Sequence, residues 1–362
     1  MKKKKSTPPE AVPAAQSAPA ASQSGAPKKE RPRSTPRQRR ARILMLVLVI
    51  LIILGVWVFR YPKSYVNMFI GHYDGTTSVV EGMNGLERSE EEQAALLPLQ
   101  QAFDDWKETH LRDEISVTAS DGVELQGGLY DAKSDVTVIL LHTFDGSNAD
   151  SDYLFASYYA EQGYNILLPD SRDHGESGGE NVTYGLLEGD DVKCWVKLLL
   201  ERYGADHQII LHGETLGANA ALAGAAAVQA DEALAGSVRF VVAESPVVNL
   251  YAEARYLMAN QFHLPGFMVA IGDWFARDSL GCSMRNVDLT QMTQGLDLPL
   301  LVLQGTEDTV VDPEQVQTFC DGYAGPVEQI SGECAHGMVY ATRQEDCEQA
   351  LDGLIGRYIS TH

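Results

Sequence analysis

The 362-residue chain has few cysteines, and none of them lies in a metal-binding pattern. There is no CxxC pair and no histidine at zinc spacing from a cysteine, so the sequence predicts no metal site. Cys320, Cys334 and Cys347 are close enough along the chain for one disulfide among them, which an oxidising compartment would allow. The odd total of five leaves at least one free thiol, and the pairing stays open.

Positive charge is scarce after the first 42 residues. Of 28 Lys and Arg residues, twelve precede residue 43, whereas only two of the 50 Asp and Glu residues do. The rest of the chain is therefore strongly acidic, which disfavours binding to nucleic acid and to anionic lipid. Apolar side chains are scarce within residues 1–42, which hold seven of the fifteen prolines, so we expect a disordered basic tail there.

The segment Ile43–Phe59 has no charged residue and is just long enough to span a bilayer. A cleaved signal peptide is the alternative, but the basic region before the segment is too long and no small-x-small cleavage site follows. We therefore expect a transmembrane helix over residues 43–61. The positive-inside rule then leaves the N-terminus in the cytoplasm and the C-terminal domain outside, as in a single-pass membrane protein with a signal anchor.

Residues 62–112 predict a juxtamembrane helical segment, and residues 113–362 are enough for one large domain. A hairpin around Asp121-Gly122 opens this domain. Short apolar strands then alternate with helices, which predicts an α/β fold with a doubly wound, mostly parallel sheet. Residues 249–296 interrupt the alternation and are rich in Met and aromatic side chains, so we expect a helical cap there.

The predicted strand Gln208–His212 leads directly into Gly213-Glu214-Thr215-Leu216-Gly217 and a small-residue helix. This is the context of a nucleophile elbow, in which G-x-S-x-G exposes a serine hydroxyl above an α/β-hydrolase sheet. Thr215 takes the place of that serine. The string Gly175–Gly179 also fits, with Ser177 in the middle, but it is separated from its strand and no helix follows, so we do not expect Ser177 to be a nucleophile.

Acyl transfer by a hydroxyl needs a base to take its proton and an acid to orient that base. Asp308 follows the predicted strand Leu300–Gln304, and His336 follows Val327–Ile330. The chain order of nucleophile, acid and histidine is that of α/β-hydrolases. The sequence therefore predicts that Thr215, Asp308 and His336 meet in one site, with no metal or organic cofactor.

Further motifs are Leu140-Leu141-His142, the run Pro169–Ser177, and Thr183-Tyr184-Gly185 with Glu188, Asp190 and Asp191. With the elbow and the Asp308 and His336 loops, they make residues 115–359 resemble bacterial α/β-hydrolases of the serine aminopeptidase-like group, in which membrane-anchored members are common. The resemblance implies a Thr215–Asp308–His336 triad and an oxyanion hole from the backbone N–H groups of Leu216 and Phe144. It also implies that the cap shapes the substrate pocket, and that His142 and Arg172 hold loops together.

Three positions depart from the family pattern: Thr215 replaces serine, while Thr143 and Asp173 replace glycines. A β-branched residue in the elbow is strained and crowds the substrate carbonyl, and Thr143 could tilt the second oxyanion donor. Two hypotheses follow. One is a membrane-anchored hydrolase of an ester, or less readily an amide or peptide, with a small-molecule or lipid-like acyl substrate. The other is a catalytically impaired binding module, which the retained Asp308 and His336 argue against.

Overall fold

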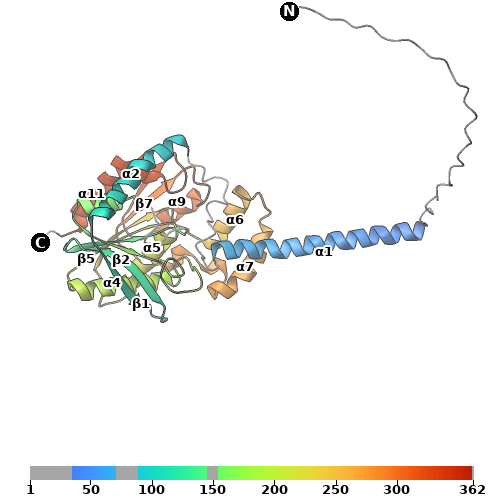
Figure 1. The fold of residues 1–362 in the computed structure, drawn as a ribbon, viewed down its shortest axis with the longest axis horizontal. Coiled ribbons are helices and arrows are strands. Elements are labelled where there is room, and N and C mark those ends of the chain that lie inside the picture. Colours follow the sequence, from blue (N-terminus) through green and yellow to red (C-terminus); the bar gives the residue numbers. More distant parts are fainter. Residues whose placement is uncertain (1–34, 71–88, 145–153, 361–362) are drawn as a thin grey trace, which may run out of the picture. The chain divides into compact units, whose positions relative to one another are not determined.

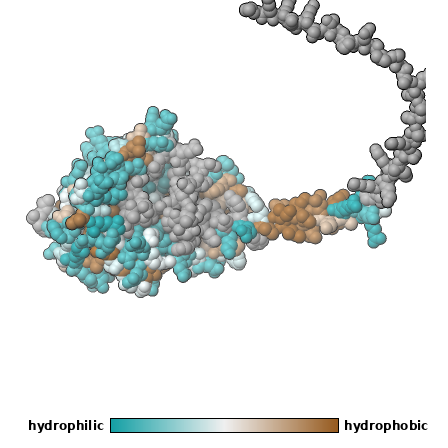
Figure 2. Space-filling view, in the orientation of Figure 1, coloured by the Kyte–Doolittle hydropathy of each residue, from teal (hydrophilic) through white to brown (hydrophobic). Residues whose placement is uncertain are grey.

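The computed structural model describes residues 35–70, 89–144 and 154–360. Residues 1–34 of the predicted basic tail lie outside the described residues. Helix α1 runs from Pro36 to Phe69. Its segment Pro36–Trp57 is long and apolar enough to cross a membrane. Figure 2 shows a hydrophobic surface along the middle of this helix, to which the exposed side chains from Ile43 to Leu54 contribute, and a hydrophilic surface at its Arg-rich start.

A sheet of eight strands forms the centre of the C-terminal domain, in the order β1-β2-β4-β3-β5-β6-β7-β8 (Figure 1). β1 and β2 form an antiparallel hairpin, β2 also pairs antiparallel with β4, and the remaining neighbours are parallel. The predicted hairpin and mostly parallel sheet are confirmed. The strands are β1 (Arg112–Thr118), β2 (Glu124–Tyr130), β3 (Val136–Leu141), β4 (Asn165–Pro169), β5 (Gln208–Glu214), β6 (Val238–Glu244), β7 (Leu300–Gly305) and β8 (Val327–Gly332).

The central strands are apolar along their whole length because both faces of the sheet are covered. All residues of β3 and β7 are buried. Successive side chains of a strand point to opposite faces, so the core divides into two clusters. Ile139 and Leu141 belong to the first cluster, whereas Val138 and Leu140 belong to the second.

Helices cover both clusters, which gives the layered α/β arrangement of Figure 1. The first cluster receives side chains from α4 (Glu188–Tyr203), α5 (Leu216–Gln229) and α9 (Pro313–Gly322). The second receives side chains from α2 (Glu90–Thr109), α3 (Ala156–Glu161), α10 (Val339–Thr342) and α11 (Gln344–Tyr358). Helix α2 lies in the predicted juxtamembrane segment, and it packs on the domain through Leu96, Leu99 and Phe103.

A helical insertion separates β6 from β7, at the position predicted for the cap. Leu257, Met258 and Val269 are buried in the first cluster, which accounts for the apolar composition of this segment. The insertion contains α6 (Leu250–Asn260), α7 (Phe267–Leu280), the short 3-10 helix η1 (Met284–Asn286) and α8 (Leu289–Met292).

All five cysteines are free thiols, so the disulfide that the sequence allowed among Cys320, Cys334 and Cys347 does not form. The sheet explains part of this result. Cys320 belongs to the first cluster, whereas Cys334 and Cys347 belong to the second, on the opposite face. Cys334 and Cys347 share a face but are buried as separate thiols.

Candidate active site

The turn between β5 and α5 has the shape of a nucleophile elbow. Thr215 separates the strand from the helix with φ of 50° and ψ of −101°. A β-branched residue is costly in this left-handed region. A Cβ atom at Gly213 would collide with the backbone of Gly217, and one at Gly217 would collide with that of Leu141. The two glycines therefore permit the close approach that the turn requires.

The structure brings Thr215, His336 and Asp308 together from three loops. Thr215 Oγ1 lies 2.7 Å from His336 Nε2, and His336 Nδ1 lies 2.8 Å from Asp308 Oδ2. The loops follow β5, β8 and β7, whose carboxyl ends share one edge of the parallel sheet. All three side chains are buried. This geometry suits transfer of the hydroxyl proton to the imidazole.

The Asp308 carboxylate is fixed by contacts on both oxygens. Oδ2 accepts hydrogen bonds from Ser245 Oγ at 3.1 Å and from Gln304 Nε2 at 3.0 Å. Oδ1 accepts from the backbone N–H groups of Val310 and Val311, each at 2.8 Å. Burial opposes ionisation, but the facing His336 and these N–H groups lower the pKa of Asp308 below its usual value. Asp308 is therefore held ionised and in one orientation.

Carboxylates surround His336 on more than one side. Burial alone would lower the pKa of His336, but Asp308, with Glu214 and Glu244, raises it to about 9. Glu214 and Glu244 are the last residues of β5 and β6 and are paired in register. The imidazolium form of His336 is consequently favoured by its surroundings.

The two expected oxyanion donors lie on opposite sides of the elbow in sequence. Leu216 is the first residue of α5, so its N–H has no partner within that helix. Phe144 is the last described residue after β3, and its carbonyl oxygen lies 2.6 Å from His174 Nε2. His142 Nε2 accepts from the Ser171 N–H at 2.9 Å. His142 thus connects two loops, which is the holding function expected of it.

Ser177 lies in a loop and has no place among the three site residues. Its hydroxyl donates to the carbonyl oxygen of Asp170 at 2.8 Å and accepts from the Gln126 N–H at 2.9 Å. Both contacts are to the backbone. The Ser177 hydroxyl therefore fastens its loop to β2, and it bridges two backbone groups rather than contacting an imidazole or carboxylate within the described residues.

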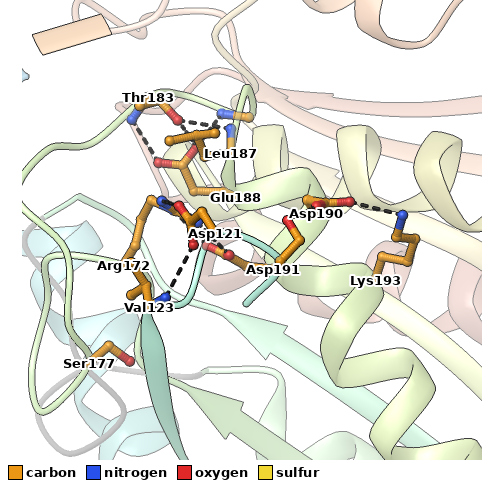
Figure 3. A network of polar contacts seen from close by, with 12 residues as sticks. Asp121, Val123, Arg172, Ser177, Thr183, Leu187, Glu188, Asp190, Asp191 and Lys193 are labelled. Atoms are coloured by element: carbon orange, nitrogen blue, oxygen red, sulfur yellow. Dashed lines mark hydrogen bonds and ion pairs between the residues drawn. The ribbon is translucent and has the colours of Figure 1, made fainter. Parts of the chain in front are cut away.

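The same loop is fixed by an ion-pair network (Figure 3). Arg172 donates to both carboxylate oxygens of Asp191, at 2.6 and 2.7 Å, and to Asp121 at 3.0 Å. Arg172 and Asp191 are buried, and burial raises the pKa of Asp191 to about 6 even though Arg172 opposes this shift. Asp173, which replaces a family glycine, has φ of 64°. Aspartate tolerates this region better than most residues.

Several side chains around the site escaped the sequence interpretation. Ser245 and Gln304 bind Asp308, Tyr256 of the cap donates to the Asp308 carbonyl oxygen at 2.8 Å, and Glu214 and Glu244 act on His336. Four of them stand at or beside the carboxyl end of a strand, a positional signal that the sequence does contain. Within the described residues, no group of three or more His, Cys, Asp or Glu side chains could hold a metal ion.

Comparison with known proteins yields relatives at low identity, and no protein-family model matches the chain. The uncharacterized protein YqkD of Bacillus subtilis (strain 168) is 26% identical over 224 residues, which cover 60% of this chain and 72% of YqkD. The structure of the Pyrococcus furiosus esterase Pf2001 is 26% identical, with a TM-score of 0.59 over 70% of this chain and 94% of the esterase. A Vibrio vulnificus α/β-hydrolase is 19% identical, with a TM-score of 0.55 over 80% of this chain and 92% of its own.

The strand order, the elbow and these similarities agree with one another. The Vibrio vulnificus protein shows the fold alone, whereas the Pyrococcus furiosus esterase also bears on the kind of chemistry. The chain has the α/β-hydrolase fold, with one apolar N-terminal helix, and its likeness to esterase structures supports a hydrolase.

Proposed function

We propose that this protein is a membrane-anchored hydrolase that cleaves an ester bond with Thr215 as nucleophile, His336 as base and Asp308 as orienting acid. The observation that carries the proposal is the pair of contacts at His336, 2.7 Å to Thr215 Oγ1 and 2.8 Å to Asp308 Oδ2. The esterase similarity favours an ester over an amide or peptide. The substrate class that we propose is a small-molecule or lipid-like acyl compound.

The reaction divides into two half-reactions at one hydroxyl. Thr215 Oγ1 attacks the acyl carbonyl carbon while its proton passes to His336 Nε2, and the Leu216 and Phe144 N–H groups would bind the oxyanion. His336 then gives the proton to the leaving alcohol, which leaves an acyl ester on Thr215. Water attacks that ester, again giving a proton to His336, and the acid product departs as Thr215 regains its proton.

The base must be neutral to accept the threonine proton, which sets the pH dependence. Because the surrounding carboxylates raise the pKa of His336 to about 9, most His336 is protonated at neutral pH. We expect kcat/KM to rise about tenfold per pH unit up to pH 9 and then to level off. A plateau that begins near pH 7 would contradict this electrostatic assignment.

Helix α1 supports the membrane anchor. Its apolar segment lies directly after a strongly basic tail, so the positive-inside rule favours a cytoplasmic N-terminus and an extracytoplasmic hydrolase domain. Protease added to intact cells should then degrade residues 113–362 and spare the tail. A protected domain with an accessible tail would reverse the orientation.

A binding module is the second candidate, and the backbone of Thr215 favours it. A β-branched residue at φ of 50° is strained where catalysis needs a freely placed hydroxyl. The full chain in detergent should hydrolyse p-nitrophenyl acetate and react with a fluorophosphonate probe, and His336→Ala should lose both activities. If the parent and His336→Ala are equally inert, the binding module takes precedence.

A further inference from the structure

Two glutamates lie side by side behind the catalytic histidine. Glu214 ends β5 and Glu244 ends β6, and these parallel strands pair the two residues in register. Side chains at paired positions point to the same face, and neighbouring strands are only about 4.8 Å apart. Glu214 immediately precedes Thr215, whose N–H donates to the Glu244 carbonyl oxygen at 2.8 Å. The pair is therefore part of the frame that holds the elbow.

Glu244 is buried with one of its carboxylate oxygens unpaired, although the backbone N–H of Val339 also interacts with this carboxyl group. Glu244 is only 4% exposed, and its Oε1 is buried with no hydrogen-bond partner. Glu214 is half-buried and faces the His336 loop, where a Cβ at Gly337 would lie 2.7 Å from Glu214 Oε1. Burying an ionised carboxylate oxygen without a hydrogen-bond donor costs free energy. The protonated form of Glu244 avoids this cost and is therefore favoured.

Repulsion between the Glu214 and Glu244 carboxylates also favours a proton on Glu244. Two adjacent carboxylates in a buried site do not both ionise freely, and the pair then titrates as a unit. Burial, followed by the Glu214 charge, raises the pKa of Glu244 to about 8. One proton between two carboxyl groups leaves one negative charge beside His336.

We propose that Glu214 and Glu244 form a carboxyl pair that shares one proton, and that its single negative charge stabilises the imidazolium of His336. The pair rests on the proposed function, in which His336 takes the Thr215 proton. Both glutamates are positioning residues, since they act through His336. Asp308 orients the ring through Nδ1, whereas the pair supplies charge from the ends of two other strands.

Other ionisable groups face this region and belong in the interpretation. Asp308 from the β7 loop acts on Glu244 and on His336, and the buried Glu253 of α6 faces both Asp308 and His336. The thiols of Cys334 and Cys347 face Glu244 from the β8 loop and α11, and burial raises the pKa of each. These thiols are neutral at physiological pH, so they add no charge near His336. Glu253 and Asp308 are the other ionisable groups there, and the test leaves both residues unchanged.

The test is a titration of His336 itself by NMR of the full chain in detergent micelles, with labelled histidine. His336→Gln identifies the signal among nine histidines. A shared proton means that Glu214→Gln and Glu244→Gln each leave one carboxylate behind. Each single change should therefore lower the pKa of His336 by less than about 0.5 pH unit, and the double change by about one unit or more.

Glu333→Gln is the matched control, because Glu333 is an exposed carboxyl on the same loop as His336. It should leave the titration unchanged, since solvent screens an exposed charge. Two results overturn the proposal: a double variant within about 0.3 unit of the parent, or single shifts that add up to the double shift. If Glu244→Gln fails to fold, Glu214→Gln and Glu214→Asn still test the proposal, because a fall of more than about 0.5 pH unit in the pKa of His336 in either variant would overturn it.

Catalysis gives a separate readout. The acid limb of kcat/KM should move in the same order, least in the single variants and most in the double variant. The NMR titration needs no turnover, so an inert chain would refute the hydrolase proposal and leave the carboxyl pair to stand on the titration of His336.

Discussion

Two stretches of this chain, Gly213–Gly217 and Gly175–Gly179, share the pattern G-x-[ST]-x-G, yet their hydroxyl groups have different surroundings. The first places Thr215 Oγ1 2.7 Å from the His336 imidazole. The second places Ser177 Oγ between two backbone groups, the Asp170 carbonyl and the Gln126 N–H. The first stretch therefore places threonine, the less reactive residue type, beside an imidazole. The second places the more reactive serine between two backbone groups.

The difference lies in what precedes and follows each string. Glu214 ends a buried strand and Leu216 begins α5, so the turn must be sharp, with Thr215 at φ of 50°. The Ser177 loop instead returns to β2 and is fastened by Arg172. A hydroxyl becomes a candidate nucleophile through backbone geometry and a nearby base, which a five-letter pattern does not encode.

The largest expected effect separates the two hydroxyls. Thr215→Ala should reduce hydrolysis by about 10³-fold or more, because the Thr215 hydroxyl is the one that contacts His336 within the described residues. Ser177→Ala should keep turnover within about twofold and cost about 1–2 kcal/mol of stability, because it leaves two backbone partners unsatisfied. Ester hydrolysis and urea unfolding of both variants measure this. Equal losses of turnover would remove the distinction between the two stretches.

Next in size is the structural importance of the Ser177 loop. Arg172→Met leaves Asp191 and its charge buried, which should lower the free energy of unfolding by about 3–5 kcal/mol. Adding Asp191→Asn should recover part of this loss. Arg357 is the control: its ion pair with Glu328 lies at the surface, so Arg357→Met should cost about 1 kcal/mol or less. Similar losses for Arg172→Met and Arg357→Met would show that the buried network contributes little.

The sequence was sufficient for the fold, and the three residues that it predicts for the site lie within hydrogen-bond distance in the structure. Alternating apolar runs located the sheet, and the chain order of Thr215, Asp308 and His336 placed them at one edge of it. Ser245 stands at the end of a strand, a position visible in the sequence, but its contact with Asp308 depends on β6 and β7 being neighbours in the sheet. The sequence also left the pairing among Cys320, Cys334 and Cys347 open, because closeness along the chain says nothing about which face of the sheet a side chain occupies.

A smaller effect is expected from Thr215→Ser, which gives the elbow the residue type that the Ser177 stretch contains. Thr215→Ser removes the methyl that is strained at φ of 50° and crowds the substrate carbonyl, so turnover should rise roughly tenfold, equivalent to about 1.4 kcal/mol. Thr143→Gly, which restores the other family residue near the oxyanion donor, should add to the gain. An inert double variant with short and medium acyl esters would favour the binding module.

The smallest expected effect concerns how the histidine loop is held. Glu92 of α2 accepts a hydrogen bond from the Ala335 N–H at 3.0 Å, one residue before His336, and its other oxygen accepts from the Ser89 N–H at 2.8 Å. Helix α2 lies between α1 and the sheet in the chain, so this contact connects that segment to the loop of the proposed base His336. The Ser177 loop has a similar contact, in which the Glu176 N–H donates to the Asp170 carboxylate at 2.9 Å, but that carboxylate belongs to the preceding loop residues and not to a helix outside the sheet.

Glu92→Ala should therefore lower kcat/KM about fivefold, the effect of about 1 kcal/mol lost from the placement of His336. Glu92→Gln retains an acceptor oxygen and should recover most of the activity. Glu91→Ala removes an exposed carboxylate from the same turn of α2 and should have no effect on turnover. Because Glu92 also caps α2, unfolding curves for all three variants are needed. A loss of stability without a change in kcat/KM would show that α2 supports the fold but leaves His336 correctly placed, and the base would then depend only on contacts made within the domain itself.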